Sequence, residues 1–315
     1  MTANGWLQIA VFGLAVLLVT KPLGLYLVAV YDGRIRWLAP VERLLYRAAG
    51  VDPATEQHWT GYAAGMLLFS AASLLLTYTA LRLQQRLPLN PQGFAAVVNR
   101  QAFETAASFT TNTNWQSYAG ESTMSYFSQM TQLAFHNFVS AAVGMALAVA
   151  LVRGIARQSA GALGNFWADL VRGTLYVLVP LSLCLALVMA HQGVIQNFDP
   201  YLRVTTLEGA TQTIAMGPVA SQEAIKQLGT NGGGFFNVNS AHPFENPTAV
   251  ANFLSMLGIL VISAAFCFTF GKMVNDRRQG FALLAAMGVL FAIGLAGIYA
   301  SEIQTNPLYP AAVTQ

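Results

Sequence analysis

Two short polar segments interrupt the apolar sequence of this chain, and their residue types suit the binding of a dehydrated monovalent cation. Residues 110–115 read TTNTNW, and residues 229–234 read GTNGGG. Such a cation needs oxygen ligands, and backbone carbonyls supply them without the full charge that would trap the ion. Glycines allow backbone angles that turn successive carbonyls toward one axis. Both segments are therefore candidate ion filters.

The candidate ligands are the Thr-Asn pair of each segment and the residues that follow it. They are Thr111, Asn112, Thr113, Asn114, Thr230, Asn231, Gly232, Gly233 and Gly234. In the first segment Asn112, Thr113 and Asn114 replace the glycines, so we expect their side chains to brace the backbone or to add oxygens. A glycine-rich turn is also typical of a nucleotide loop, but the Gly-Lys-Ser/Thr ending of such a loop is missing here.

The two segments belong to an internal repeat. An offset of 119 residues aligns Glu104 with Glu223, Thr111 with Thr230, Asn112 with Asn231, and Arg153 with Lys272. Because the offset also matches the apolar stretch after each segment, the repeat is a whole supersecondary unit. Glu104 and Glu223 are interpreted as filter support, and we expect Gln116, at the outer end of the first filter, to hydrogen-bond the filter backbone.

The composition indicates an all-α polytopic membrane protein. Charged residues make up 9% of the chain and hydrophobic residues 55%, whereas a soluble domain has roughly 25% charged residues. The partner that this composition implies is membrane lipid. The net charge of +3 is small and Arg277-Arg278 is the longest basic run, so no nucleic-acid partner is expected. Cys184 and Cys267 lie in apolar stretches and indicate neither a disulfide nor a metal site.

Six apolar segments are long enough, at about 20 residues each, to cross a hydrocarbon core of roughly 30 Å. They are residues 6–30, 61–83, 126–152, 174–192, 248–271 and 281–300. Lys21-Pro22 interrupts the first of them. We divide the chain into an N-terminal span and loop (1–60), two span/pore-loop/span repeats (61–153 and 174–272), and the first span of an incomplete third repeat (281–315).

The distribution of Lys and Arg predicts the orientation, because short basic loops stay on the cytoplasmic side. The loops after the first, third and fifth spans carry ten basic residues: Arg34, Arg36, Arg43, Arg47, Arg153, Arg157, Arg172, Lys272, Arg277 and Arg278. The longer loops after the second and fourth spans hold only Arg86, Arg100, Arg203 and Lys226, with Arg82 at a span end. Both candidate filters and the N-terminus are therefore predicted to lie outside.

Each filter follows a short amphipathic helix, predicted at residues 99–109 and 221–228. Neither helix is long enough to cross the membrane, so we interpret both as re-entrant pore helices. Irregular backbone at membrane depth is tolerated where it is buried in protein or lines a water-filled cavity. The filter should therefore climb back outward along such a cavity. The partial negative charge at the C-terminal end of each short helix favours a cation there.

Residues 110–118 (TTNTNWQSY), 229–237 (GTNGGGFFN) and 240–247 (SAHPFENP) closely resemble the first two filter regions of the KdpA family. These proteins are the potassium-transporting subunits of the bacterial Kdp P-type ATPase, in the superfamily of potassium transporters. The resemblance runs along the whole chain. It implies a non-catalytic inner-membrane subunit that selects K+ from outside and passes it to a KdpB-like P-type ATPase subunit. KdpC-like and KdpF-like subunits would complete the complex.

The resemblance also implies four filter repeats around one pore, and this chain carries two. The span at 281–300 then begins a third repeat without its filter, so we expect a truncated copy or a fragment of a longer reading frame. A truncated, non-functional fragment is thus one alternative. A Trk or Ktr type potassium transporter subunit, which shares the repeat, is another. A third is a membrane-embedded enzyme, for which Glu104, His136 and Glu223 would have to converge in one cavity.

Overall fold

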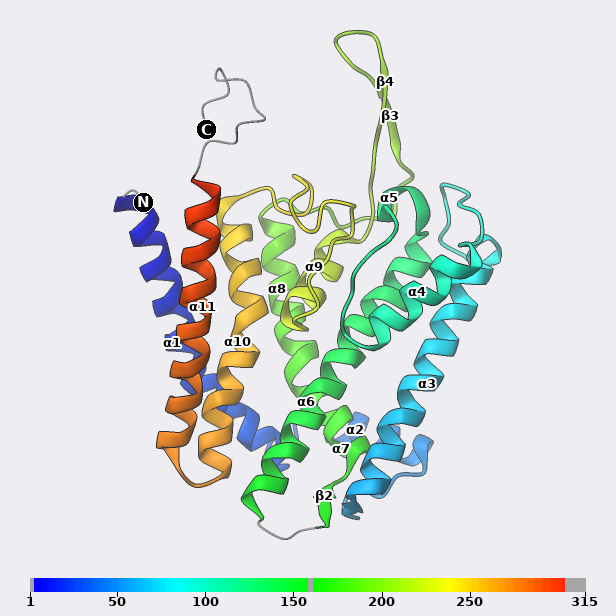
Figure 1. Ribbon diagram of the computed structural model, residues 1–315. Helices are drawn as coiled ribbons and strands as arrows, with labels where there is room; N and C mark the ends of the chain where they lie inside the picture. Colours follow the sequence, from blue (N-terminus) through cyan, green and yellow to red (C-terminus); the bar gives the residue numbers. More distant parts are fainter. Residues whose placement is uncertain (1–2, 158–160, 304–315) are drawn as a thin grey trace.

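The computed structural model describes residues 3–157 and 161–303. In this part of the chain six helices are long and apolar enough to cross a membrane, which confirms the predicted all-α polytopic fold. Three are single helices: Ala3–Tyr31 (α1), Ala249–Met273 (α10) and Arg277–Glu302 (α11). The other three are continuous runs of shorter elements: α3 (Trp59–Leu83) with η1 (Gln84–Arg86), η2 (Ser128–Ala134) with α6 (Phe135–Ala156), and α7 (Phe166–Arg172) with η3 (Gly173–Leu178) and α8 (Val179–His191). Figure 1 shows them running roughly alongside one another, with the N-terminus and the end of α11 at the same end of the bundle.

Two features of the predicted spans differ most from the structure. The first span is one unbroken helix through Pro22, so the loss of one backbone donor there does not end it. The fourth begins at Phe166 rather than at residue 174. The charges near its start have buried partners: Arg153 Nη2 lies 3.0 Å from Asp169 Oδ1, and Arg172 lies 3.2 Å from Glu42. Ion pairing therefore lets the helix start eight residues earlier (174 minus 166).

The remaining elements connect these helices at the two ends of the bundle. They are α2 (Ala39–Ala49), β1 (Gln57–His58), α4 (Asn99–Thr110), α5 (Gly120–Thr123), β2 (Ala162–Gly164), β3 (Leu202–Thr205), β4 (Thr211–Ile214) and α9 (Val219–Leu228). β1 pairs antiparallel with β2, and β3 pairs antiparallel with β4. The β3–β4 hairpin projects from the end of the bundle that carries α5, and the β1–β2 pair lies at the opposite end (Figure 1).

The two short helices expected before the candidate filters are confirmed as helices. α4 packs on α3 and α6, and α9 packs on α8 and α10. In both places a short helix thus lies against the long helices before and after it. A helix of 12 residues, such as α4, is about 18 Å long, well short of a bilayer core.

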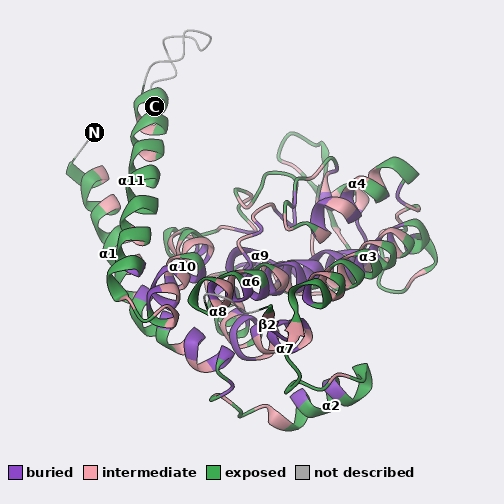
Figure 2. Ribbon diagram, turned by 60° about the horizontal axis from the view of Figure 1, so that its bottom comes forward, coloured by how far each residue is buried: buried purple, intermediate pink, exposed green. Residues whose placement is uncertain are grey.

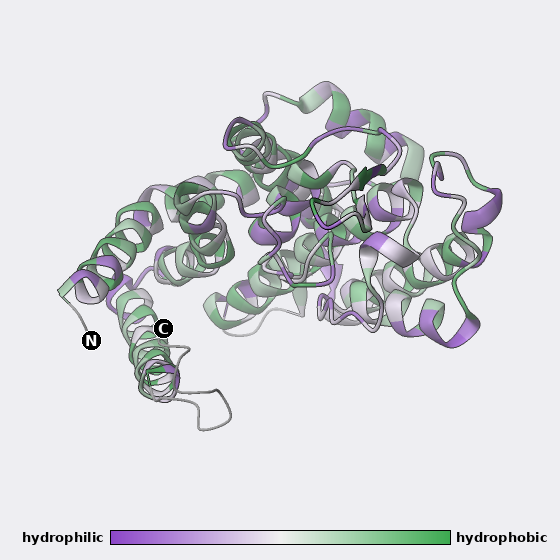
Figure 3. Cartoon of the chain, turned by 90° about the horizontal axis from the view of Figure 1, so that it is seen from above, coloured by the Kyte–Doolittle hydropathy of each residue, from purple (hydrophilic) through white to green (hydrophobic). Residues whose placement is uncertain are grey.

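The core lies in the middle of the bundle. Its largest cluster joins α1, α3, α6, α7, η3 and α10, with Leu27, Tyr62, Ala146, Tyr176 and Ala265 among its members. Figure 2 shows the buried residues concentrated there and around α9, whereas α11 is exposed along its length; Gly280 is its one buried residue. In Figure 3 the long helices are hydrophobic along most of their length, and the hydrophilic residues gather mainly in the connecting segments. This is the pattern of a protein solvated by lipid.

Candidate functional site

The fold brings the two repeat copies into contact through their equivalent asparagines. The side-chain amide of Asn231 donates a hydrogen bond to Asn112 Oδ1, across the sequence separation of 119 residues that relates the copies. Ser140 of α6 donates a 2.8 Å hydrogen bond to the same Asn112 oxygen. The helices α4 and α9 end directly before these residues. They therefore position both Thr-Asn pairs against α6.

Gln116 forms a second link between the copies. Its amide nitrogen donates to the Gly234 carbonyl at 2.9 Å, and its amide oxygen accepts from the Gly234 backbone nitrogen at 3.1 Å. The sequence led us to expect a hydrogen bond to the filter backbone, and the partner in the structure is the other filter segment. Gly120 also approaches this segment so closely that an added Cβ would overlap the Phe235 carbonyl. The two segments thus form one connected unit.

The backbone of both segments is left-handed at several positions. In the first segment φ is +60° at Asn112 and +56° at Asn114. In the second it is +57° at Thr230, +69° at Gly232 and +84° at Gly233. Asparagine and glycine tolerate this region, but a β-branched residue such as Thr230 does so only under strain. Such strain at a turn is typical of a functional segment.

Neutral groups support the first segment. Thr111 Oγ1 bonds the Ala107 carbonyl at 2.9 Å and lies 2.9 Å from Thr113 Oγ1. Ser108 donates to the Trp115 carbonyl at 3.1 Å. The side chain of Asn114 is buried, and its amide nitrogen and oxygen have no hydrogen-bond partner among the described residues. A buried amide in this state is able to bind a polar ligand.

The two predicted supporting glutamates differ in their surroundings. Glu104 lies 2.8 Å from Arg100, a residue whose side chain is 90% exposed, and it accepts a 3.4 Å hydrogen bond from Ser117. Glu223 is completely buried and forms an ion pair with Lys226. Glu104 and Glu223 therefore occupy equivalent positions in the repeat but lie in different environments.

Sequence analysis gave no supporting role to three residues behind the second segment, namely Lys226, Ser240 and Glu245. Lys226 was counted as an outer-loop cation, but its side chain is 1% exposed and lies 3.2 Å from Glu245. Its position three residues after Glu223 on α9 was the available signal, because residues i and i+3 share a helix face. The pairing with Glu245 had no local signal.

His242 lies near the second segment. Its ring lies against that of Phe236 with centroids 4.4 Å apart, and burial lowers the pKa of His242.

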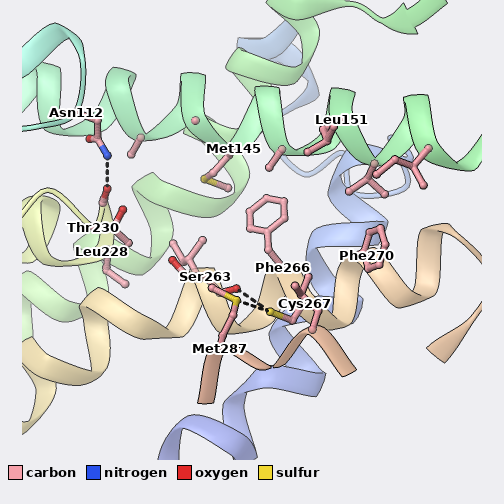
Figure 4. A pocket seen from close by; sticks show the side chains of 18 residues that line it. Asn112, Met145, Leu151, Leu228, Thr230, Ser263, Phe266, Cys267, Phe270 and Met287 are labelled. Carbon is pink, nitrogen blue, oxygen red and sulfur yellow. Dashed lines mark hydrogen bonds between the residues drawn. The ribbon is translucent and has the colours of Figure 1, made fainter. Parts of the chain in front are cut away.

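Two cavities flank the connected segments. One of about 270 Å³ lies beside Gly232 and Gly233 and is also lined by Ser240, Asn246 and Asn252. The other, of about 560 Å³, extends from Asn112 and Thr230 between α6, α10 and α11 (Figure 4). Its remaining lining is mostly apolar, with Met145, Phe266 and Met287 facing it. This cavity therefore has polar groups where it meets the segments and apolar side chains along α6, α10 and α11.

The three groups of the enzyme hypothesis have separate partners. Glu104 contacts Arg100 and Ser117. His136 lies 3.1 Å from Thr77 Oγ1 and 2.9 Å from the Gln132 carbonyl, and Glu223 is held in the Lys226 network. Within residues 3–157 and 161–303, no three His, Cys, Asp or Glu residues gather in a way that would hold a metal ion. This geometry does not favour acid/base chemistry between the three groups.

The described structure is that of a multi-pass helical membrane protein in which two polar segments meet. Residues 10–315 match the family described as KdpA, the potassium-transporting ATPase A subunit, and the chain belongs to this family. The match does not favour the Trk or Ktr alternative.

Curated relatives of high identity carry the same name, potassium-transporting ATPase potassium-binding subunit. The one from Solibacter usitatus is 58% identical over 312 residues, which are 98% of this chain and 55% of the relative. One from Methylorubrum extorquens is 59% identical over 310 residues, 97% of this chain and 54% of the relative. That from Allorhizobium ampelinum is 53% identical over 315 residues, 99% of this chain and 55% of the relative. The chain spans about half the length of these relatives.

Proposed function

We propose that this chain is the potassium-binding and translocating subunit of an ATP-driven potassium uptake complex. The observation that carries the proposal is the contact between Asn112 and Asn231, because it joins the two copies at the residues that their alignment equates. The relatives' name, potassium-binding subunit of a potassium-transporting ATPase, supports the same function.

The proposed ligands are the oxygens of residues 111–114 and 230–234. Around Gly232 the space is open, since an added Cβ would meet no atom within 4 Å. The glycine there serves the backbone angle rather than a tight contact, and it leaves room for an ion beside the carbonyls. Neutral dipoles in a ring favour a weakly hydrated cation such as K+ and still release it. In the proposal, Gln116, Glu104 and Glu223 support the two segments.

We further propose that α4 and α9 are re-entrant helices of two repeats, 61–153 and 174–272, with 1–60 and 281–315 as the flanking parts. Residues 304–315 of the last part lie outside the described residues. In Figure 1 α4 descends from the end of the bundle near α5, and the chain then returns to α5. The negative ends of the helix dipoles would favour a cation below the segments.

The proposed location is the bacterial inner membrane, with the N-terminus and both segments outside. The β3–β4 hairpin and Arg157 then lie on opposite sides. A cysteine in place of Gln212 should react with a reagent that cannot cross the membrane, and one in place of Arg157 should react only after permeabilisation. The reverse pattern would overturn this orientation.

Energy for transport would come from a partner. A KdpB-like P-type ATPase subunit would hydrolyse ATP, and KdpC-like and KdpF-like subunits would complete the complex. Potassium-stimulated ATP hydrolysis should therefore appear only when the ATPase subunit is present. Hydrolysis by this chain alone would contradict the non-catalytic role.

The binding proposal is tested by ion competition on the complex that contains this chain. Bound radioactive rubidium should be displaced by potassium and by unlabelled rubidium, and not by sodium at similar concentrations. Leu295→Ala in α11 serves as a control, because Leu295 lines neither of the two cavities, and it should alter stability more than selectivity. Equal displacement by sodium would remove the filter assignment.

A further inference from the structure

A buried network of three charged residues lies directly behind the second segment. Lys226 contacts both Glu223 and Glu245, and all three side chains are at most 1% exposed. Glu223 and Lys226 come from α9, and Glu245 comes from the loop before α10. The network therefore ties the helix before the segment to the loop after it.

The stability of the fold alone does not explain a buried network of charged residues. Removing three charges from water is costly, and apolar residues of similar volume often stabilise a core equally well or better. The network is therefore better understood through the backbone groups that it holds. Glu245 Oε1 accepts the backbone N–H groups of Phe235 and Phe236, the latter at 3.2 Å. These are the two residues that follow Gly234.

Ser240 connects the network to a candidate ligand. Its hydroxyl lies 2.7 Å from the Gly233 carbonyl oxygen and 3.2 Å from Glu223 Oε2. Gln227 donates to both Ser240 and Glu223 at 3.0 Å. A hydroxyl has one proton, so Ser240 can donate to the Gly233 carbonyl or to the Glu223 carboxylate. When Ser240 donates to the Gly233 carbonyl, it stays attached to the network through Gln227, which donates to both Ser240 and Glu223.

We propose that Ser240, held by the buried Glu223–Lys226–Glu245 network, is a positioning residue that sets the discrimination between potassium and sodium at the Gly233 carbonyl. This inference rests on the proposed function. Discrimination by spacing needs carbonyls that do not close in on a smaller ion. A donor behind the carbonyl, fixed to a buried ion network, resists that closure.

Among the described residues, no buried charged network of this kind lies behind the first segment. At the offset of 119 residues, Ala107 stands in place of Lys226, Tyr126 in place of Glu245 and Glu121 in place of Ser240. Asn114, the equivalent of Gly233, has a buried side-chain amide instead. The control of selectivity is therefore assigned to the second segment alone.

Ser240→Gly tests the proposal with little backbone cost. The φ of Ser240 is +67°, a value that glycine adopts readily, so the variant removes the hydroxyl and keeps the turn. Asn239→Gly is the matched control, because Asn239 is the neighbouring residue, is exposed and has a φ of +49°. Both are measured by rubidium displacement with potassium and sodium in lipid nanodiscs that hold the full chain and its partner subunits.

We expect Ser240→Gly to lower potassium-over-sodium discrimination about tenfold, as the loss of one hydrogen bond in a charged network would. Potassium should still bind, and Asn239→Gly should keep the original ratio. Unchanged discrimination in Ser240→Gly would overturn this inference and leave the proposed function standing. Failure of the unaltered complex to bind potassium would overturn both.

A double variant separates positioning from simple stabilisation. If Glu223 acts through Ser240, Glu223→Gln should lower discrimination, and Glu223→Gln with Ser240→Gly should be no worse than Ser240→Gly alone. A role limited to stability would lower the melting temperature and leave the ion ratio unchanged. Additive losses in the double variant would contradict the assignment to Ser240.

Discussion

The two polar segments occupy equivalent places in the repeat and are stabilised by different means. Neutral hydroxyl and carbonyl groups join the first segment to α4, and the ion pair of Arg100 with Glu104 lies toward solvent. Behind the second segment, the side chains of Lys226 and two glutamates are at most 1% exposed. The two copies therefore share the Thr-Asn pair and meet at its asparagines, while the supporting groups differ. The sequence is thus shared where the two segments meet, and it differs in the groups that support them.

The largest expected difference concerns two cationic side chains near the segments, Lys226 and Arg100. Lys226→Met leaves two carboxylates buried without their counter-ion, so we expect a loss of roughly 3–5 kcal/mol in the free energy of unfolding. Arg100→Met removes an exposed partner and should leave stability unchanged within error. Melting temperatures in detergent would compare them. Similar losses of stability in the two variants would contradict the difference between a buried ion network behind the second segment and an exposed ion pair near the first.

The next effect concerns the close approach of the segments. Gly120→Ala places a methyl group against the Phe235 carbonyl, and such overpacking should cost about 1–3 kcal/mol of stability. Gly144→Ala in α6 is the matched control, because an added Cβ there meets nothing within 4 Å and alanine favours the helix. If both variants melt at the temperature of the unaltered chain, the segments are not packed together at Gly120.

A smaller effect is expected at the link between the segments. Gln116→Ala removes both hydrogen bonds to Gly234 and should lower the apparent affinity for potassium about tenfold. Gln101→Ala removes a 2.9 Å hydrogen bond within the first copy, to the Ser117 carbonyl, and should have less effect. Rubidium displacement by potassium measures both. An equal loss of potassium affinity in the two variants would show that the hydrogen bonds between the segments matter no more than one within the first copy.

The features that follow from local sequence could be predicted. Long apolar runs predict the six helices, and the repeat predicts α4, α9 and the equivalence of Asn112 with Asn231. The same alignment could not show that Glu223 is buried, because its environment depends on Glu245, which is 22 residues further along (245 minus 223). It also could not show that Gln116 bonds the other segment, 118 residues away.

The early start of the fourth span has a similar cause. Asp169 and Arg172 look like loop residues when each charge is considered alone, but they pair with Arg153 and Glu42 from other parts of the chain. Paired charges are tolerated in a helix that single charges would exclude. Long-range pairing is therefore what sequence patterns left out.

The central claim is that the second segment binds the ion, and Gly232→Asp tests it most directly. The φ of Gly232 is +69°, so a side chain there adds backbone strain of about 1 kcal/mol or more. The new carboxylate attracts any cation, sodium included, and does not preserve the spacing that favours potassium. Thr113→Asp, at the equivalent position of the first segment, adds the charge at a residue whose φ is not left-handed.

Rubidium displacement by potassium and by sodium would be measured on the assembled complex for both variants. The account predicts that Gly232→Asp loses potassium affinity and discrimination against sodium together, and that Thr113→Asp loses less of both. If Gly232→Asp kept both properties, residues 229–234 would be an ordinary outer loop, and the second segment would not be an ion filter.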